Sequence, residues 1–215
     1  MYEFFRWLAI VTGWPFQALF FKRKTYYEDR KLQGIRVKGS ALVVTNHYSI
    51  LDYIMNVFLF FPRKLWVVLS EWIFQQSDFF YWGMKFFGGI CADRETKSMS
   101  FVDKSAEVLE KGGLVQIFPE AHNTPDGEMH PFKPSYVLIA LRSGAPIIPV
   151  ITDGNYGIFR RAHVIVGKKI YLRDYCSSVN PSREEIERLN SLIFDKCTEL
   201  RTQLFVKTGR LPEKN

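Results

Sequence analysis

Ala-Leu-Val-Val-Thr-Asn-His-Tyr-Ser-Ile-Leu-Asp, residues 41–52, is the stretch that decides the predicted fold. Residues 41–45 form a compact apolar run with β-branched side chains, which is typical of a buried strand. Polar residues follow at once, and we expect a helix to begin near Ser49 and to stop before Pro62. His47 should therefore lie just beyond the carboxyl end of a strand, where open α/β sheets place their ligands.

His47 and Asp52 form a candidate catalytic pair only if they lie on different elements. On one helix, this spacing would point the two side chains roughly 140° apart. With His47 in the loop and Asp52 in the first helical turn, the carboxylate can fix the tautomer of the imidazole. Neutral imidazole can then take a proton from an alcohol. However, Ser49 and Asp52 also match the S-x-x-D pattern of a helix cap, and the stretch alone leaves both interpretations open.

The rest of the chain alternates between apolar runs and helical periods. Residues 26–38 are predicted to be a polar connector that ends in a short strand at 35–37. Further strands are predicted at 65–69, 90–94, 114–118, 147–152, 162–166 and 169–172. Helices are predicted at 72–87, 98–110 and 134–142, and a long one begins after Ser182. This alternation predicts one layered α/β domain over residues 25–215, with a mostly parallel mixed sheet flanked by helices.

Composition limits the partners of this domain. A length of 215 residues suits a single domain, and a net charge of +7 favours anionic partners such as anionic lipid, nucleic acid or CoA-like substrates. The basic residues are dispersed and no recognition motif is present, so we expect no nucleic acid. The chain has 3 cysteines, no CxxC spacing and no evident signal peptide, which predicts reduced thiols and the cytoplasmic side of a membrane.

Residues 1–24 differ from the domain that follows. Residues 4–21 are mostly apolar and rich in Phe and Trp, and the basic patch Lys22-Arg23-Lys24 comes directly after them. Gly13-Trp14-Pro15 predicts a break into two short helices. Bulky aromatic residues beside a basic cluster predict a segment that lies in the membrane interface and binds membrane lipids. Packing against the domain's own core and a true membrane span are the alternatives.

Short blocks in a fixed order resemble the glycerolipid (lysophosphatidic acid) acyltransferase superfamily. Residues 46–52 resemble the NHxSxxD signature of that family, and residues 88–94, Gly-Gly-Ile-Cys-Ala-Asp-Arg, resemble its second block. Residues 118–120, Phe-Pro-Glu, open like its third block, and residues 144–150, Gly-Ala-Pro-Ile-Ile-Pro-Val, resemble the fourth. Together the blocks span residues 46–150, roughly half of the chain.

This resemblance implies an O-acyltransferase of phospholipid biosynthesis. The donor would be acyl-CoA or acyl carrier protein, no metal or other cofactor is expected, and the acceptor would be 1-acyl-glycerol-3-phosphate or a related lysophospholipid. His47 would be the general base and Asp52 its orienter, with direct attack on the thioester and no covalent enzyme intermediate. Substrate-binding residues would be Asn46, Ser49, Arg94, Glu120, His122, Lys133 and Pro146.

The expected roles of these residues differ. Arg94 and Lys133 would hold phosphate by charge-assisted hydrogen bonds. Glu120 would contact the polar part of the acceptor or support the site, and Pro146 would help to build the acyl-donor side. The alternatives are a surface ion pair for Arg94, an ordinary loop position for Lys133, and a turn before a buried strand for Pro146.

The third block departs from the family pattern. Ala121-His122-Asn123 stand where the family has Gly-Thr-Arg. Asn123 cannot supply the charge or the bidentate grip of a guanidinium, and Ala121 disfavours the positive φ that glycine adopts easily. Three explanations remain open: another cation such as His122, Lys133 or Arg94 carries the phosphate, the acceptor is a different lipid, or activity is weak. A different acceptor would have a larger headgroup or be an acylated amino-acid lipid.

Two rival classes stay open at this point. His47, Asp52, Glu120, His122 and His130 could assemble a hydrolytic metal site, although no HExxH or comparable local spacing supports it. A non-catalytic lipid-binding protein of the membrane surface is the second rival. We favour an intact acyltransferase, peripheral or monotopic on the cytoplasmic face of a membrane.

Overall fold

The structure is a computed structural model that describes residues 2–28, 37–92, 99–122, 128–176, 178 and 180–209, without the side chains of Tyr2 and Phe80. Its centre is a 7-stranded sheet with the strand order β1-β7-β6-β2-β5-β3-β4. Only the β6–β7 pair is antiparallel within this sheet. The strands are β1 (Lys24–Tyr27), β2 (Ala41–Thr45), β3 (Leu65–Ser70), β4 (Gly89–Ala92), β5 (Leu114–Ile117), β6 (Ile147–Thr152) and β7 (His163–Val166).

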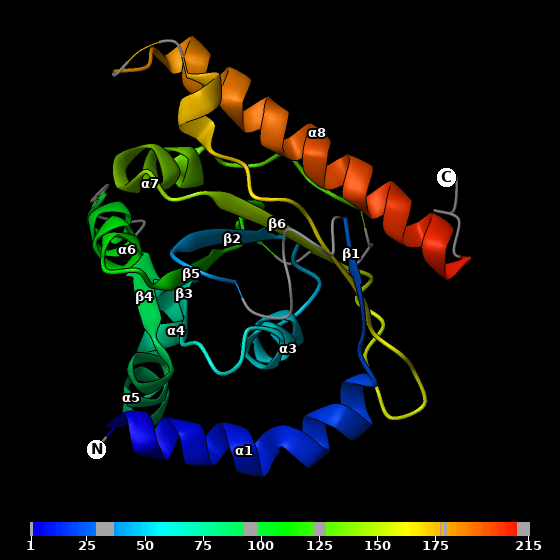
Figure 1. The fold of residues 1–215 in the computed structure, drawn as a ribbon. Helices are drawn as coiled ribbons and strands as arrows, with labels where there is room; N and C mark the ends of the chain where they lie inside the picture. The colour runs from blue at the N-terminus through cyan, green and yellow to red at the C-terminus, as the bar shows by residue number, and fades with distance from the viewer. Residues whose placement is uncertain are drawn as a thin grey trace.

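Helices cover both faces of the sheet. In Figure 1, α7 and α8 lie above the sheet, α3 and α1 lie below it, and α4, α5 and α6 lie near its β4 edge. The helices are α1 (Tyr2–Phe21), α3 (Leu51–Leu59), α4 (Glu71–Gln75), α5 (Asp78–Phe87), α6 (Ser100–Glu110), α7 (Ser135–Ser143) and α8 (Arg183–Thr208). The predicted layered α/β domain with a mostly parallel mixed sheet is therefore confirmed.

Strand β2 lies at the centre of this arrangement, and all of its residues are buried. Leu42 and Val44 belong to the core under α7 and α8, whereas Ala41 and Val43 belong to the core above α3. Both faces of a strand flanked by parallel partners must be apolar, which explains why residues 41–45 show no polar alternation. The loop that follows β2 is consequently held by a rigid, fully packed strand.

Helix α1 corrects the prediction of two short helices. It is one helix of 20 residues with Pro15 inside it. Proline removes one backbone hydrogen bond, but the ring of Trp14 packs against Phe58 and Phe61, and Gly13 lies against the Phe58 ring. These contacts outweigh the lost hydrogen bond, so the helix continues through the proline. Among the described residues, no helix has both the length and the apolar character that crossing a membrane requires.

Several predicted boundaries are also corrected. Residues 24–27 form edge strand β1, which the prediction placed partly in the N-terminal segment and partly in a connector. Its partner β7 is far away in the sequence, so local periodicity could not indicate the pairing. The strand predicted at 169–172 is reduced to a bridge between Ile170 and Ile147, after which the chain forms a 3-10 helix, Leu172–Tyr175. Residues 35 and 36 of the strand predicted at 35–37 lie outside the described residues.

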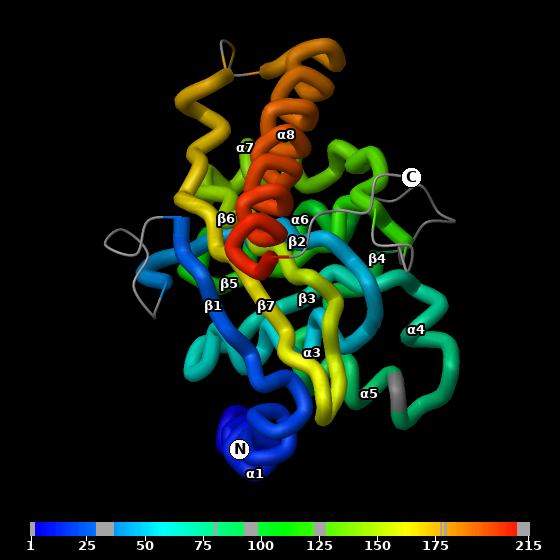
Figure 2. The backbone as a smooth tube through the Cα atoms, turned by 90° about the vertical axis from the view of Figure 1, so that its right-hand side faces the viewer, coloured from blue at the N-terminus to red at the C-terminus, as the bar shows by residue number. Residues whose placement is uncertain are grey.

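The segment after β3 forms two helices instead of the one that was predicted. Residues 72–87 were predicted to form a single helix, but α4 ends at Gln75 and α5 begins at Asp78. Serine and aspartate favour helix N-termini, and Ser77 and Asp78 interrupt the apolar period at this point. The aromatic period is therefore divided between two helices that pack beside β3 and β4. Figure 2 shows this part of the chain from the side.

Candidate active site

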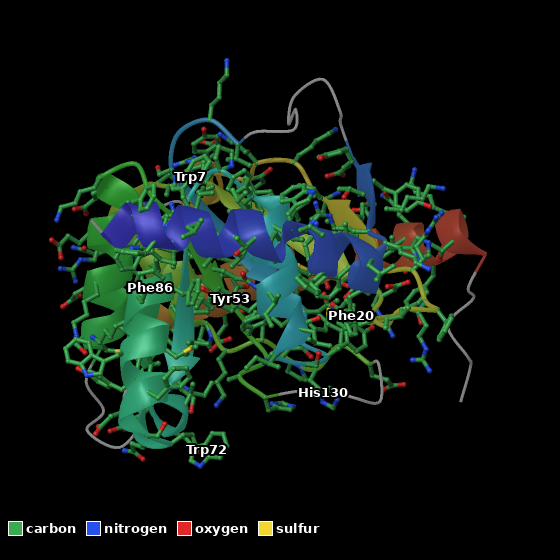
Figure 3. All side chains as sticks on the ribbon, turned by 90° about the horizontal axis from the view of Figure 1, so that it is seen from below. Trp7, Phe20, Tyr53, Trp72, Phe86 and His130 are labelled. Atoms are coloured by element: carbon green, nitrogen blue, oxygen red, sulfur yellow. The ribbon has the colours of Figure 1, made fainter. Side chains whose placement is uncertain are left out.

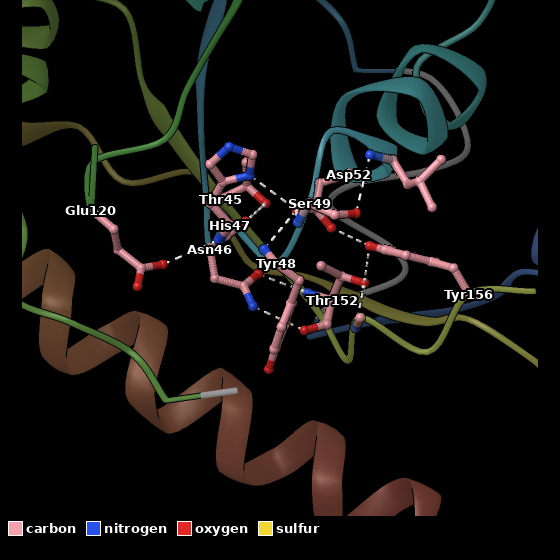
Figure 4. A network of polar contacts seen from close by, with 11 residues as sticks. Thr45, Asn46, His47, Tyr48, Ser49, Asp52, Glu120, Thr152 and Tyr156 are labelled. Atoms are coloured by element: carbon pink, nitrogen blue, oxygen red, sulfur yellow. Dashed lines mark hydrogen bonds and ion pairs between the residues drawn. The ribbon is translucent and has the colours of Figure 1, made fainter. Parts of the chain in front are cut away.

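The candidate site lies where parallel strands β2, β5 and β6 end. β2 pairs with β5 on one side and with β6 on the other, so the loops after all three strands meet at one edge of the sheet. His47 follows β2, Glu120 follows β5, and Thr152 is the last residue of β6. Figure 4 shows the network of polar contacts that joins these three loops.

His47 and Asp52 are in contact, as their spacing predicted. His47 Nδ1 lies 3.1 Å from Asp52 Oδ2, with the histidine in the loop and the aspartate in the first turn of α3. The Asp52 side chain is fully buried, whereas the His47 ring is partly exposed. The ring of Phe118 stacks on the imidazole with the ring centres 3.9 Å apart. The imidazole is thus held from one edge by a carboxylate and from one face by an aromatic ring.

Asp52 also holds the backbone of the loop. Its Oδ2 accepts hydrogen bonds from the Tyr48 N–H at 2.7 Å and from the Ser49 N–H at 2.8 Å. The bond from the Ser49 N–H to the Asp52 carboxylate is one of the two bonds of the S-x-x-D capping pattern noted in the sequence. The helix was predicted to begin near Ser49, and in the structure it begins at Leu51. Asp52 therefore holds the loop that leads into α3 and contacts His47 at the same time.

Tyr156 is a site residue that sequence reasoning missed. Its hydroxyl donates a hydrogen bond to Asp52 Oδ1 and lies 3.0 Å from Thr152 Oγ1. Burial raises the pKa of Tyr156 far above its usual range, and the negative charge of Asp52 raises it further. The phenol consequently keeps its proton and remains a donor to the carboxylate. The position of Tyr156 in the sequence could have indicated this role, because its loop follows β6, which neighbours β2 in a parallel sheet.

Asn46 and Ser49 were predicted to bind substrate, but their side chains contact the protein backbone. Asn46 Nδ2 donates to the Thr152 carbonyl, and Asn46 Oδ1 accepts from the Thr152 N–H, both at 3.0 Å. This pair of bonds ties the loop after β2 to the end of β6. Ser49 Oγ accepts from the Leu51 N–H at 3.2 Å. Both residues thereby fix the position of His47.

Glu120 lies beneath the site and supports it. The buried carboxylate accepts a hydrogen bond from the His47 N–H at 3.1 Å through Oε1 and another from the His130 N–H at 3.0 Å through Oε2. Burial raises the pKa of Glu120, while these two backbone hydrogen bonds oppose the rise. Of the two roles considered from the sequence, the contacts match support of the site.

Ala121 adopts a backbone conformation that is uncommon for residues other than glycine. Its φ is 61°, in the left-handed region that glycine favours. The sequence predicted that alanine would disfavour this conformation, yet the backbone keeps it at a cost of roughly 1–2 kcal/mol. Ala121 keeps this conformation because the carboxylate of the preceding residue, Glu120, is held by two backbone N–H groups. The turn therefore forms with alanine at this position, while Asn123 lies outside the described residues.

His47 lines a cleft with a volume of about 890 Å³. His122 and Lys133 line the same cleft, as do Pro134 and Ser135 at the start of α7. The remaining wall is mainly apolar and includes Val68, Leu69, Trp72, Ile73, Phe101 and Leu138. Arg94 lies outside the described residues, although Ala92, at the end of β4, lines the cleft. One space thus combines an imidazole, an ammonium group and a long apolar wall.

Pro146 is not part of this cleft. It precedes β6, and its carbonyl accepts a hydrogen bond from the Leu42 N–H at 2.9 Å, near the beginning of β2. His47 follows the other end of β2, so the sheet separates Pro146 from the imidazole by nearly the length of a strand. The predicted role of Pro146 on the acyl-donor side therefore has no support in its position, which matches the alternative of a turn before a buried strand.

The residues of the rival metal site are only partly brought together. The rings of His122 and His130 are 5.2 Å apart, and Glu120 bonds the backbone of His130 rather than facing an open space. Within the part of the chain that the structure describes, no group of three or more His, Cys, Asp or Glu side chains could hold a metal ion.

Comparisons with known proteins find similar sequences. A family model described as Acyltransferase matches residues 25–153. The putative 1-acyl-sn-glycerol-3-phosphate acyltransferase acl-2 of Caenorhabditis elegans is 35% identical over 130 residues, which cover 59% of this chain and 44% of that protein. A 1-acyl-sn-glycerol-3-phosphate acyltransferase of Pseudomonas aeruginosa is 28% identical over 160 residues, which cover 70% of this chain and 60% of that protein.

A solved structure has a similar fold. The crystal structure of the 1-acyl-sn-glycerophosphate acyltransferase PlsC from Thermotoga maritima matches with a TM-score of 0.57 and 20% identity. The match covers 84% of this chain and 73% of that chain. The chain spans about half of the length of the curated relatives that it matches.

Proposed function

The chain belongs to the acyltransferase family, and from this premise we propose that it esterifies a lysophospholipid. The proposed donor is acyl-CoA or acyl carrier protein, and the proposed acceptor is 1-acyl-glycerol-3-phosphate or a related lipid with a free hydroxyl. The observation that carries the proposal is the contact between His47 and the buried Asp52 at the wall of the cleft. The names of the relatives support the class of acceptor.

In the proposed reaction, His47 acts as a general base. The contact with Asp52 keeps a proton on Nδ1, so Nε2, which points away from Asp52 in Figure 4, can accept the proton of the acceptor hydroxyl. The hydroxyl oxygen then attacks the thioester carbonyl carbon, and a C–O bond forms. The C–S bond breaks, and the leaving thiolate takes the proton from the imidazolium. No group of the protein is acylated in this sequence of steps.

The phosphate of the acceptor is assigned to the end of the cleft near α7. Lys133 and His122 line the cleft together with His47. Pro134 and Ser135, at the N-terminus of α7, line it as well, and the N–H groups of a helix N-terminus attract anions. This arrangement supports the first explanation for the missing family arginine, in which another cation carries the phosphate.

Replacing Lys133 with methionine is expected to raise the KM for 1-acyl-glycerol-3-phosphate by roughly tenfold, because a charge-assisted hydrogen bond contributes about 1.5–3 kcal/mol. The kcat should change little, since the proton transfer to His47 is untouched. Steady-state kinetics over a range of acceptor concentrations measure both constants. Lys168→Met is the matched control, because Lys168 is exposed on the loop after β7 and does not line the cleft. A KM equal to that of the parent would remove Lys133 from the site.

The acceptor is tested with a panel of lipids and one labelled acyl group, supplied in parallel as acyl-CoA and on acyl carrier protein, and the products are read by lipid mass spectrometry. We expect 1-acyl-glycerol-3-phosphate to be acylated faster than lysophospholipids with larger headgroups. Faster acylation of a large-headgroup lysophospholipid or an acylated amino-acid lipid would favour the second explanation for Asn123. Absence of product with every acceptor, and with both donor carriers, would contradict the proposed function.

We also propose that the protein binds a membrane surface through α1, at the cytoplasmic face. The buried side of this helix is half polar, because Arg6 and Gln17 are buried there beside Ile10 and Phe21, whereas an ordinary surface helix buries mainly apolar residues. The polar side chains of Arg6 and Gln17 face the protein and are only 5% and 8% exposed, whereas Phe4 is 68% and Phe16 77% exposed. Figure 3 shows α1 lying across this side of the molecule. Packing on the domain accounts for Ile10 and Phe21 but leaves most of the large apolar side chains of α1 exposed, and this exposure supports contact with lipid.

Replacing Phe4 and Leu8 together with serine is expected to weaken binding to lipid vesicles by roughly tenfold or more, because both exposed side chains would lose apolar burial in the bilayer. Co-sedimentation with vesicles of phosphatidylcholine and phosphatidylglycerol measures the partition. Point substitutions are preferable to deletion of residues 1–24, since Phe21 belongs to the core and Lys24 to β1. Val206→Ser, exposed on α8, is the control, and equal partition of parent and double variant would reject the role of α1.

A further inference from the structure

The connection between β6 and β7 carries an unusually exposed aromatic tip. Residues 157–161, Gly-Ile-Phe-Arg-Arg, form this tip, which we name the docking loop. Phe159 is 99% exposed and Ile158 is 49% exposed. A solvated phenylalanine next to another exposed apolar residue needs an explanation, because such side chains usually bury most of their surface. The docking loop is not used by the proposed chemistry.

The docking loop lies against the C-terminal end of α1. The Gly157 N–H donates to the Phe20 carbonyl at 3.3 Å, and the Ala162 N–H donates to the Phe21 carbonyl at 2.8 Å. Figures 1 and 2 both show the loop beside this end of the helix. Ile158 lines an apolar groove of about 460 Å³ together with Phe16, Leu19 and Ile54. The docking loop and the C-terminal part of α1 therefore share an apolar surface at this groove.

Positive charge accompanies this apolar surface. Arg160 and Arg161 directly follow Phe159, and both are exposed, as is Lys22 after the end of α1. Neither arginine is paired with a carboxylate among the residues that the structure describes. Exposed apolar side chains beside cations match the layered chemistry of an anionic bilayer, in which the acyl region lies beneath phosphate groups. This complementarity favours lipid over an apolar protein partner.

We propose that the docking loop is a second membrane anchor, in which Phe159 inserts among the lipids and Arg160 and Arg161 bind the phosphates of anionic headgroups. The proposal rests on the membrane attachment in the proposed function and extends it from α1 to a separate element. In this proposal, lipid at the edge of the bilayer, and not a second protein, occupies the apolar groove beside Ile158.

Hydrogen bonds hold the base of the docking loop. Contact of its tip with the membrane would therefore fix the distance between the candidate site and the membrane surface. Asp153 Oδ1 accepts hydrogen bonds from the Asn155 N–H at 3.1 Å and from the His163 N–H at 3.0 Å. Asn155 Nδ2 donates to the Arg161 carbonyl at 3.0 Å and closes the loop. Tyr156, which bonds Asp52, lies within this braced segment. An anchor at Phe159 is thereby connected to the His47 site by a short, well-bonded path.

The test compares vesicle binding of Phe159→Ser with that of the parent protein, without donor or acceptor. Co-sedimentation with vesicles of phosphatidylcholine containing phosphatidylglycerol should show roughly tenfold weaker partition, because one phenylalanine no longer enters the bilayer. The partition of the double variant R160Q/R161Q should fall by roughly fivefold for each removed charge, and this fall should occur only with vesicles that contain the anionic lipid. Tyr171→Ser, an exposed aromatic position before the 3-10 helix, should bind like the parent.

Parent-like partition of Phe159→Ser would overturn the proposal, and so would equal losses for Phe159→Ser and Tyr171→Ser. A change in the oligomeric state of Phe159→Ser, measured by light scattering, together with unchanged vesicle binding would instead make the docking loop a contact between protein copies. Because vesicle binding requires no acyl transfer, failure here is independent of the proposed chemistry. Loss of binding in the α1 double variant but not in Phe159→Ser would reject only the docking loop.

Discussion

Replacing His47 with alanine is expected to lower the rate of acyl transfer by roughly 10²–10⁴-fold, the usual contribution of a positioned general base. The imidazole joins the buried Asp52 carboxylate to the wall of the cleft, and the substitution removes this proton acceptor. The His47 ring is partly exposed and packs mainly on Phe118, so the fold should remain. Release of free thiol from acyl-CoA, followed with a thiol reagent in the presence of acceptor, measures the rate.

The chain offers a matched control for this substitution. His163 Nδ1 lies 2.8 Å from a fully buried carboxylate, that of Asp153, so this pair resembles the first one in geometry and burial. His163 does not line the cleft, however. His163→Ala should therefore lose far less activity than His47→Ala. Equal rates above the uncatalysed background for His47→Ala and the parent would contradict the role of His47, and rates at that background for both would favour the non-catalytic lipid-binding alternative.

Asp52→Asn is the second substitution with a large expected effect, again roughly 10²–10⁴-fold in kcat. The carboxylate accepts hydrogen bonds from the Tyr48 and Ser49 N–H groups and from Tyr156, and it holds His47 as well. An amide has one acceptor oxygen, and its NH₂ group would face one of these donors. We therefore also expect a loss of about 1–3 kcal/mol in the free energy of unfolding. Kinetics and urea unfolding measure the two effects separately.

The two measurements distinguish the roles that the sequence left open for Asp52. A variant that is less stable but retains the kcat of the parent would make Asp52 a helix cap only. A fall in kcat well beyond that of Asp153→Asn would identify the carboxylate that orients His47. Asp153 is a suitable control because its side chain is equally buried and also holds a histidine.

The sequence was most informative where one short segment carries the whole geometry. The strand at 41–45 was predicted without error, and the contact between His47 and Asp52 followed from their spacing and from the loop between them. Both inferences depend on residues that are near in the chain. The long helix capped by Ser182 was predicted for the same reason, since Ser182 Oγ accepts from the Glu185 N–H.

Features that depend on distant contacts were missed. Tyr156 reaches Asp52 across the sheet, and Asn46 is held by Thr152, so neither role is visible in local sequence. Helix α1 continues through Pro15 because aromatic rings of another segment pack against it. Pro146 matched a family block but lies at the other end of the strands, which only the sheet register reveals. The order of the motifs thus predicted the family, whereas the sheet topology determines which residues lie together at the candidate site.

The central claim is direct, base-catalysed transfer, and single-turnover mass spectrometry tests it most directly. The protein is mixed with labelled acyl-CoA and 1-acyl-glycerol-3-phosphate, and the free thiol, the diacyl product and the intact protein are all measured. We expect thiol and diacyl product to appear in equal amounts, with no acyl group on the protein at any time. Accumulation of acylated protein, or release of thiol without diacyl product, would contradict the assignment of His47 as the base that activates the acceptor hydroxyl.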